Sequence, residues 1–456
     1  MKYISTRGES KELGFEEALL RGLAPDGGLY VPSEWPSIDF TKLKNQFYWE
    51  SAAEILQPFF GDFIDKKELN ILTKKAYKSF NTENMTPLIQ LDDNKYLLEL
   101  FHGPTLAFKD FAMLLLAELF DLSLKKRNKN ITIIGATSGD TGSAAIEAFK
   151  NSKNVNVFIF FPKDRVSEIQ KKQMTTTGGD RVFPIEINGT FDDCQNIVKA
   201  LFNDSSFNNE VSLGAINSIN WGRIAAQIVY YFTSFKLLEN GPISYSVPTG
   251  NFGDILAGWV AKKIGLPINN LLIATNENDI LARTLKSGIY SIDKAKATMS
   301  PSMDIQISSN FERLLFEAYG RDSSKIKSLM SNLKDNKEFT IDDYALDFIK
   351  KDFHAKSISE EDTTSCISDV YKKTGYVLDP HTAVGYAASN SLPSEGSIIT
   401  LGTAHPAKFP TAVKKSLGTV PEMPDRLKKV MNGDERFSEM NIDLEKIKDF
   451  IRSNIV

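Results

Sequence analysis

The chain has 456 residues and a formal net charge of −4, with 42% hydrophobic and 25% charged residues. This composition is close to the average of globular proteins, which excludes a disordered or fibrous chain, and the length predicts several domains and an enzyme-sized molecule. The acidic balance and the absence of long Lys/Arg runs argue against a nucleic-acid or anionic-membrane surface, so any phosphate has to be bound locally.

The beginning of the chain shows no apolar signal segment, which predicts a cytosolic protein. A prominent apolar stretch, Phe111–Ala117, is far shorter than the ~20 residues of a membrane span, so we expect no membrane contact. Cys194 and Cys366 lie far apart without CxxC spacing. They predict buried thiols rather than a disulfide framework or a metal site.

The first ~95 residues have helical apolar spacing and a turn at Ala24–Gly28, which indicates a separate helix-rich N-terminal unit. After it, short β-rich runs alternate with helical stretches. This alternation predicts an α/β fold with parallel sheets and right-handed crossovers. The expected strands are Ile131–Ile134, Val155–Phe161, Val182–Ile187, Tyr245–Val247, Leu271–Ala274 and Ser397–Leu401. Residues ~320–375 are polar and charged, typical of solvated helical surface.

One lysine, Lys109, stands between the turn at Gly103–Pro104 and the apolar run Phe111–Phe120. Apolar neighbours desolvate an amine, which lowers its pKa and makes it a usable Schiff-base nucleophile. Taken alone, however, the segment is more typical of a lysine that begins a helix and extends its amine to solvent.

Two Gly/Ser/Thr loops, Thr137–Ser143 and Thr249–Asp254, each follow a predicted strand and precede a predicted helix. Such loops offer free N–H groups and a helix N-terminus, and therefore favour an anion. Gly250 and Gly253 allow the backbone to approach that anion closely. The first loop contains neither GxGxxG nor the GK[ST] of a P-loop, so the nucleotide-binding fingerprints do not apply. A plain strand-to-helix turn explains either loop alone but not both.

Three residues between the loops and one after the last strand complete the candidate site. Asn217 and Ser218 provide neutral donors, and Arg223 provides a planar guanidinium suited to phosphate or carboxylate. Thr403 is placed to form a hydrogen bond with a ring nitrogen.

Six motifs occur in order between residue 3 and about residue 410: YISTRG, DGGLYVP, HGPTLAFKD, ATSGDTG, VPTGNFGD and TAHPAKF. In this order they resemble the threonine synthase family of the longer bacterial and fungal type. The resemblance implies a fold-type-II pyridoxal-phosphate (PLP) enzyme with two parallel-sheet α/β domains. Its implied parts are an N-terminal domain 1–94, a smaller α/β domain 95–235, a larger one 236–416 and a C-terminal helical extension 417–456.

The resemblance also implies roles for the matching residues. Lys109 would hold PLP as a Schiff base, and Thr403 would meet its pyridine nitrogen. The cofactor phosphate would be cradled by Gly250, Asn251, Phe252, Gly253 and Asp254. The loop that contacts the substrate carboxylate or the cofactor face is matched by Thr137, Ser138, Asp140 and Thr141. The site for the substrate phosphate is resembled by Asn217, Ser218 and Arg223.

The implied reaction converts O-phospho-L-homoserine and water to L-threonine and phosphate, in a monomer or homodimer. Three alternatives stay open: a related PLP-dependent phospholyase or dehydratase that releases a 2-oxo acid, a nucleotide-binding enzyme, and a non-catalytic relative that keeps the scaffold. For His102, His381 and His405 we expect structural hydrogen bonds, although His102 and His405 adjoin the motifs.

Overall fold

The N-terminal part of the chain combines helices with a small antiparallel sheet. The computed structural model describes residues 1–43, 46–80, 82, 84–137, 139–164, 166–214, 216–238, 241–393 and 395–455. The sheet has the order β2–β1–β3, with β1 (Lys2–Ser5), β2 (Leu13–Gly14) and β3 (Tyr30–Pro32). The helices are α1 (Phe15–Arg21), α2 (Tyr48–Phe60) and α3 (Lys66–Ala76). The helix-rich N-terminal unit is thus confirmed, with a sheet that was not expected.

The larger of the two main sheets has the order β14–β11–β10–β15–β5–β4. Its strands are β4 (Leu88–Asp92), β5 (Lys95–Glu99), β10 (Ile243–Pro248), β11 (Ile268–Thr275), β14 (Phe353–Ser357) and β15 (Ser397–Gly402). All neighbours run parallel except β4, which is antiparallel to β5. Because β10 and β15 are parallel neighbours, the loops that follow them leave the same edge of the sheet.

Helices and two short strands surround the larger sheet. They are α9 (Trp221–Phe235), α10 (Gly253–Lys263), α11 (Ile280–Ser287), β12 (Ile289–Ser291), α12 (Phe311–Ala318), α13 (Ser323–Asn336), β13 (Glu338–Thr340), α14 (Asp343–Lys350), α15 (Glu360–Thr374), α16 (Pro380–Ser389) and α17 (Pro410–Leu417). Helix α16 contacts β10, β11 and β15, whereas α11 contacts β11 and β14.

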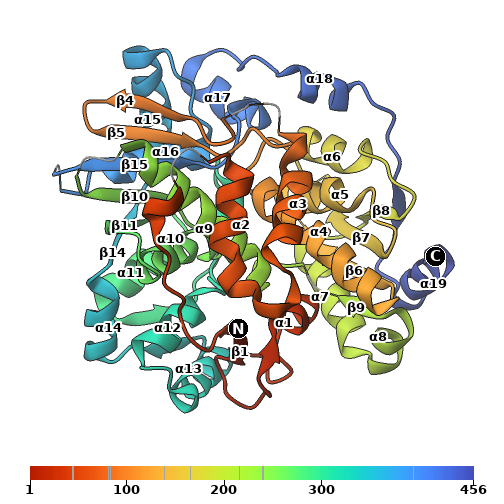
Figure 1. The fold of residues 1–456 in the computed structure, drawn as a ribbon. Coiled ribbons are helices and arrows are strands. Elements are labelled where there is room, and N and C mark those ends of the chain that lie inside the picture. The colour runs from red at the N-terminus through yellow and green to blue at the C-terminus, as the bar shows by residue number, and fades with distance from the viewer. Residues whose placement is uncertain are drawn as a thin grey trace.

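The smaller main sheet has the order β16–β8–β7–β6–β9 and is parallel throughout. Its strands are β6 (Ile131–Ala136), β7 (Val155–Pro162), β8 (Val182–Ile187), β9 (Leu213–Gly214) and β16 (Ser438–Met440). The helices are α4 (Lys109–Arg127), α5 (Asp140–Phe149), α6 (Glu168–Thr175), α7 (Phe191–Asn203), α8 (Ser205–Val211), α18 (Asp425–Met431) and α19 (Leu444–Asn454). Figure 1 shows this sheet on the right, the larger sheet on the left, and α2 and α3 in front.

Short 3₁₀ turns link these elements, namely η1 (Phe40–Leu43), η2 (Gly61–Phe63), η3 (Tyr77–Ser79), η4 (Lys236–Leu238), η5 (Pro301–Met303) and η6 (Pro406–Lys408). None of the described helices is long and apolar enough to cross a membrane.

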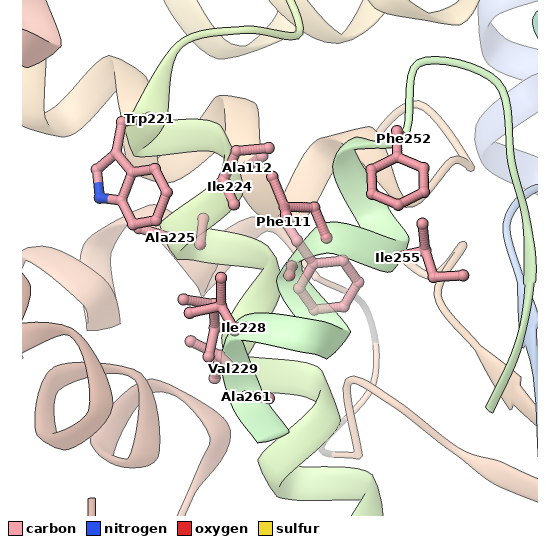
Figure 2. Packing of buried hydrophobic residues seen from close by; sticks show 14 of the residues in the cluster. Phe111, Ala112, Trp221, Ile224, Ala225, Ile228, Val229, Phe252, Ile255 and Ala261 are labelled. Carbon is pink, nitrogen blue, oxygen red and sulfur yellow. The ribbon is translucent and has the colours of Figure 1, made fainter. Parts of the chain in front are cut away.

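The main core lies where α9 packs against α4 and α10. Figure 2 shows this packing, with Phe111 of α4 between α9 and the side chains of Phe252 and Ile255. Phe111 and Ile228 are fully buried, and Trp221 at the start of α9 is 1% exposed. Large apolar side chains therefore fix the three helices whose starts border the candidate site.

Side-chain oxygens cap the starts of several helices, whereas α10 has no such cap. Thr190 and Asp193 form a reciprocal capping box at α7, and Asn220 accepts a hydrogen bond from the N–H of Gly222 at α9. Helix α10 has no side-chain cap, and Phe252 before it has a left-handed backbone with φ of 63°. Its first N–H groups are therefore available to a ligand.

The six predicted strands are all present, but two regions differ from the prediction. The polar stretch 320–375 contains β14, whose parallel pairing with β11 makes it an edge of the larger sheet. The C-terminal extension contains β16, which pairs with β8 of the smaller sheet. Neither short strand shows the apolar run that marks the central strands. Pairing also crosses the expected domain boundaries, because β4 and β5 join the sheet of residues 236–416; the boundaries themselves stay predictions.

Candidate functional site

A cavity lies where the loops after β6, β10 and β15 meet the start of α4. It is lined by Phe108, Lys109, Asp140, Thr141, Ser218, Arg223, Gln227, Pro248, Thr249, Gly250, Asn251, Phe252, Gly253, Asp254, Ile255, Ser302, Met303, His381, Thr403 and Ala404. Most of the residues singled out in the sequence therefore meet in one place.

Lys109 is the first residue of α4 and is 9% exposed. Its Nζ lies 3.6 Å from Oδ2 of Asp140. Burial lowers the pKa of the Lys109 amine, and the positive charges of Lys408 and Arg223 lower it further, against the opposing effect of Asp140. The lowered pKa agrees with the prediction. It increases the fraction of Lys109 whose amine is unprotonated and can act as a nucleophile.

The turn before Lys109 is held by Asp110. The carboxylate of Asp110 accepts hydrogen bonds from the backbone N–H and the hydroxyl of Thr105, at 2.8 and 2.7 Å. Burial raises the pKa of Asp110 to about 6. The N–H of Phe108 donates to the carbonyl of Thr403 at 2.9 Å. This bond ties the lysine turn to the loop after β15 and brings Lys109 and Thr403 to the same cavity.

The loop 249–253, between β10 and α10, is anchored through its carbonyl groups. Ser308 donates a hydrogen bond to the carbonyl of Gly250 at 2.6 Å. The side chain of Asn310 donates one to the backbone carbonyl of Asn251 at 2.9 Å. The ring of Phe252 is buried against Phe311, with centroids 5.3 Å apart. Because the carbonyls are bound on one side and α10 lacks a cap, the N–H groups of residues 250–253 can bind an anion.

Asp254 in the first turn of α10 has an unusual environment. Its Oδ1 accepts hydrogen bonds from the hydroxyls of Tyr230 and Tyr231 at 2.5 and 3.1 Å, whereas Oδ2 is buried with no hydrogen-bond partner among the described residues. Burial raises the pKa of Asp254 to about 7, against the lowering effect of the two tyrosines. The carboxyl therefore keeps its proton for much of the time near pH 7, which makes it compatible with a nearby phosphate.

Arg223 lies on α9 and is 4% exposed. One terminal nitrogen, Nη1, donates to the carbonyl of Ile216 at 3.3 Å, and Nε is buried without a partner among the described residues. Burial lowers the pKa of Arg223 to about 10, which still leaves it mostly charged at neutral pH. A buried guanidinium with a free donor beside a cavity is suited to an anionic ligand.

The remaining predicted residues occupy different positions relative to the cavity. Thr141, Ser218 and Thr403 line it, whereas Asn217 is exposed and does not. Thr137 is buried beneath the loop, where its hydroxyl oxygen accepts hydrogen bonds from the N–H groups of Gly139 and Gly142 at 3.1 Å. Thr137 thus shapes the loop without lining the cavity. Ser138 lies outside the described residues. The ligand roles of all these residues stay predictions.

His381 lines the cavity and makes the structural hydrogen bonds that we expected. Its Nε2 accepts a hydrogen bond from the N–H of Ser302 at 3.2 Å, and its Nδ1 lies 3.0 Å from Oδ1 of Asp379. The neutral ring therefore carries its proton on Nδ1 and donates it to Asp379. This pair joins α16 to the segment around Ser302 that forms one wall.

His102 and His405 border a second cavity, which is also lined by Pro421, Glu422, Pro424, Asp425 and Arg426. Nε2 of His102 lies 2.7 Å from Oε2 of Glu99, and Nδ1 of His405 accepts a hydrogen bond from the N–H of Ala407 at 3.1 Å. Burial lowers the pKa of His405 to about 4. Both histidines therefore have structural partners, as expected.

Sequence reasoning missed Lys408, Gln227 and the Ser302–Met303 segment. Lys408 is fully buried, with Nζ 2.8 Å from Oδ1 of Asp140. Lys408 is the lysine of the TAHPAKF motif, but nothing in a single lysine reveals burial. Gln227 follows Arg223 by one helical turn on α9, a spacing that could have identified it.

These residues fit PLP. A buried amine, a set of loop N–H groups for a phosphate, and the Thr403 hydroxyl for the ring nitrogen surround one cavity. Arg223, which lines the same cavity, offers a second anion position through its guanidinium. The donor set therefore matches a cofactor that carries an aldehyde, a phosphate and a pyridine ring, together with an anionic substrate.

Comparisons with known proteins agree with this fit. Residues 2–77 match the model "Threonine synthase N terminus", residues 80–402 match "Pyridoxal-phosphate dependent enzyme", and residues 382–451 match "Threonine synthase, C-terminal". The chain is 45% identical to threonine synthase of Pseudomonas aeruginosa, over 99% of this chain and 98% of that protein, and 43% identical to that of Saccharomyces cerevisiae, over 99% and 98%. The crystal structure of PLP-bound threonine synthase from Brucella melitensis superposes with a TM-score of 0.97 at 48% identity, covering 100% of this chain and 99% of that one. The chain belongs to the threonine synthase family of pyridoxal-phosphate-dependent enzymes.

Proposed function

We propose that the enzyme converts O-phospho-L-homoserine and water to L-threonine and phosphate, with PLP bound at Lys109. One observation carries the proposal: a single cavity combines a buried amine with two separate positions for anions, the loop 250–253 and the guanidinium of Arg223. A cofactor phosphate and a substrate phosphate need two such positions. A chain with a net charge of −4 offers no general attraction that could replace them.

In this proposal, each part of the cofactor has its own protein contact. Lys109 would hold the aldehyde carbon through its amine. The N–H groups of Gly250, Asn251, Phe252 and Gly253 would bind the phosphate, and Thr403 would bind the ring nitrogen. Bound PLP supplies an electron sink that stabilises negative charge on the substrate carbon next to the amino group.

Lys109 would also move protons. Its amine lies in the cavity, and burial lowers its pKa toward the range in which an amine can both accept and return a proton at neutral pH. We propose that Nζ removes the proton from the substrate's α carbon and later returns protons as the product forms. A threonine hydroxyl at the ring nitrogen cannot stabilise a positive charge there as a carboxylate would. The course of the reaction therefore depends more on where Lys109 is positioned.

The substrate's two ends would bind on opposite sides of that amine. The loop 137–141 at the start of α5 would take the carboxylate, with Thr141 lining the cavity. Ser218 and Arg223 would take the leaving phosphate, with Asn217 at the margin of that site. The free Nε of Arg223 supports this assignment, because a charged donor left without a partner gains most from an anion.

A product assay separates this reaction from the related phospholyase or dehydratase. The purified enzyme is incubated with PLP and O-phospho-L-homoserine, and threonine, phosphate and 2-oxobutyrate are measured together. We expect threonine and phosphate in equal amounts. Formation of 2-oxobutyrate without threonine would contradict the proposal. The cytosolic location and the monomeric or homodimeric state stay predictions from the sequence.

A further inference from the structure

Lys408 is a lysine without any exposed surface, and it joins three loops of the cavity. It lies in η6, just after the loop of Thr403. Its Nζ donates a hydrogen bond to the carbonyl of Thr105 in the lysine turn at 2.8 Å, and it forms an ion pair with Oδ1 of Asp140 at 2.8 Å. Gln173 donates to the same carbonyl of Thr105 at 2.9 Å. The amine of Lys408 is thus part of the framework and not a ligand at the surface of the cavity.

Asp140 stands between two lysines. Its Oδ1 receives Lys408 and a hydrogen bond from Gln170 at 3.0 Å, and its Oδ2 lies 3.6 Å from Nζ of Lys109. Burial alone would raise the pKa of Asp140, but Lys408 and Lys109 outweigh burial and hold that pKa well below its usual range. Asp140 is therefore a buried carboxylate in the loop that, in the proposed function, takes an anion.

A fixed negative charge at this position opposes the binding of a carboxylate unless another charge offsets it. Lys109 cannot offset it throughout the reaction, because its amine is used by the cofactor and the substrate. Lys408 does not contact the cofactor or the substrate in this proposal, because it does not line the cavity and donates its hydrogen bond to the carbonyl of Thr105.

We propose that Lys408 is a positioning residue that neutralises Asp140, so that the loop at the start of α5 can take the substrate's carboxylate beside Lys109. The proposal rests on the proposed function. Asp140 in turn orients the amine of Lys109, while Lys408 offsets the negative charge of Asp140.

The charges that face Lys109 predict how its amine responds to the loss of Lys408. Asp140 of α5 raises the pKa of Lys109, whereas Lys408 of η6 and Arg223 of α9 lower it. Asp254 of α10 also faces this amine. Without Lys408, the attraction of Asp140 acts on Lys109 alone, and the amine holds its proton to higher pH.

The first test compares Lys408→Met with wild type. Methionine fills a similar volume without a charge, and Lys414→Met, at an exposed lysine of α17, is the matched control. We expect KM for O-phospho-L-homoserine to rise by at least about tenfold, with a smaller effect on kcat, because a buried charge is left unpaired where the substrate binds. Lys414→Met should behave as wild type. An unchanged KM in a folded Lys408→Met protein would overturn the proposal.

The second test uses Lys408→Met combined with Asp140→Asn, which removes both charges and leaves none unpaired. We expect the double variant to fold and to restore KM to within a few fold of wild type, while kcat stays reduced because Asp140 no longer orients the amine of Lys109. This outcome is decisive even if Lys408→Met alone fails to fold. A KM in the double variant raised as far as that expected for the single variant would overturn the proposal.

A third measurement does not depend on turnover. In the apoenzyme, the pH dependence of amine labelling at Lys109 is followed by mass spectrometry. We expect the midpoint to move to higher pH in Lys408→Met and to return to the wild-type position or below in the double variant. A midpoint that does not move in Lys408→Met would contradict the charge argument. If wild type makes no threonine, the proposed function fails while this measurement still decides the link between Lys408 and Lys109.

Discussion

Replacing Arg223 by methionine should weaken ligand binding and at the same time stabilise the apoenzyme. The guanidinium is 4% exposed, donates a hydrogen bond of 3.3 Å to the carbonyl of Ile216, and leaves Nε without a partner among the described residues. A buried donor without a partner lowers the stability of the protein that has no ligand, but it strengthens the binding of an anion. Most substitutions of buried residues lower the stability of a protein. A variant that binds its ligand more weakly but is more stable without it is therefore diagnostic.

The size of both effects follows from the contacts. A buried donor without a partner costs about 1–3 kcal/mol, and one ordinary hydrogen bond contributes about 0.5–1.5 kcal/mol. Arg223→Met removes one of each; it also leaves the carbonyl of Ile216 without that donor, but it relieves the burial of a positive charge, so the free energy of unfolding of the apoenzyme should rise by about 1 kcal/mol. A hydrogen bond to a charged group contributes about 1.5–3 kcal/mol, which corresponds to a rise of about 10- to 150-fold in the Kd of inorganic phosphate and in the KM of the substrate.

Urea unfolding of the apoenzyme and titration with inorganic phosphate measure the two effects separately. Arg313→Met is the matched control, because Arg313 is also buried but is satisfied by the carbonyls of Tyr30 and Ile219, at 2.9 and 2.6 Å, and by Asn310. That variant should lose at least about 3 kcal/mol, since it strands buried acceptors. If Arg223→Met is destabilised to the same degree as the control and phosphate affinity is unchanged, the reasoning about Arg223 is wrong.

Three further outcomes follow from the same geometry. Thr403→Val removes a hydroxyl that lines the cavity but keeps the carbonyl that binds Phe108, so kcat should fall about 2- to 10-fold in steady-state assays while the melting temperature stays the same. Phe111→Ala empties a fully buried position 4.6 Å from the ring of Phe80 and should cost about 3–5 kcal/mol in urea unfolding; a loss below about 1 kcal/mol would contradict the packing. Burial lowers the pKa of His405 to about 4, below the ~6.5 of an unfolded histidine, so the unfolded chain takes up the proton first. Stability should therefore fall as the pH drops from about 6.5 to about 4, and His405→Gln should show a flatter dependence in urea unfolding across that range.

The central strands could be predicted because they are buried on both faces and read as continuous apolar runs, as Val155–Phe161 does in β7. Edge strands lack that signal. Strand β14 (Phe353–Ser357) alternates buried and less buried residues within a polar region, and its place in the sheet depends on pairing with β11, more than 70 residues earlier. Local patterns cannot reveal such distant pairing.

The candidate site divides in the same way. Lys109 and the loop Gly250–Asp254 could be found from the sequence, because glycine-rich loops after strands have a local signature and occur here in an ordered series of motifs. Lys408 could not, because the same residue type is usually exposed, and its burial depends on Asp140 arriving from another loop. The sequence also cannot show that Nε of Arg223 has no hydrogen-bond partner among the described residues whereas Nε of Arg313 has one, because this difference depends on contacts in three dimensions.

The most direct test of the central claim is borohydride reduction of the PLP-loaded enzyme followed by peptide mapping and a threonine assay on the same sample. We expect the reduced cofactor on the peptide that contains Lys109, with loss of threonine formation in proportion to the labelled fraction. Label on another lysine, such as Lys408, or full turnover by Lys109→Ala, would contradict the account.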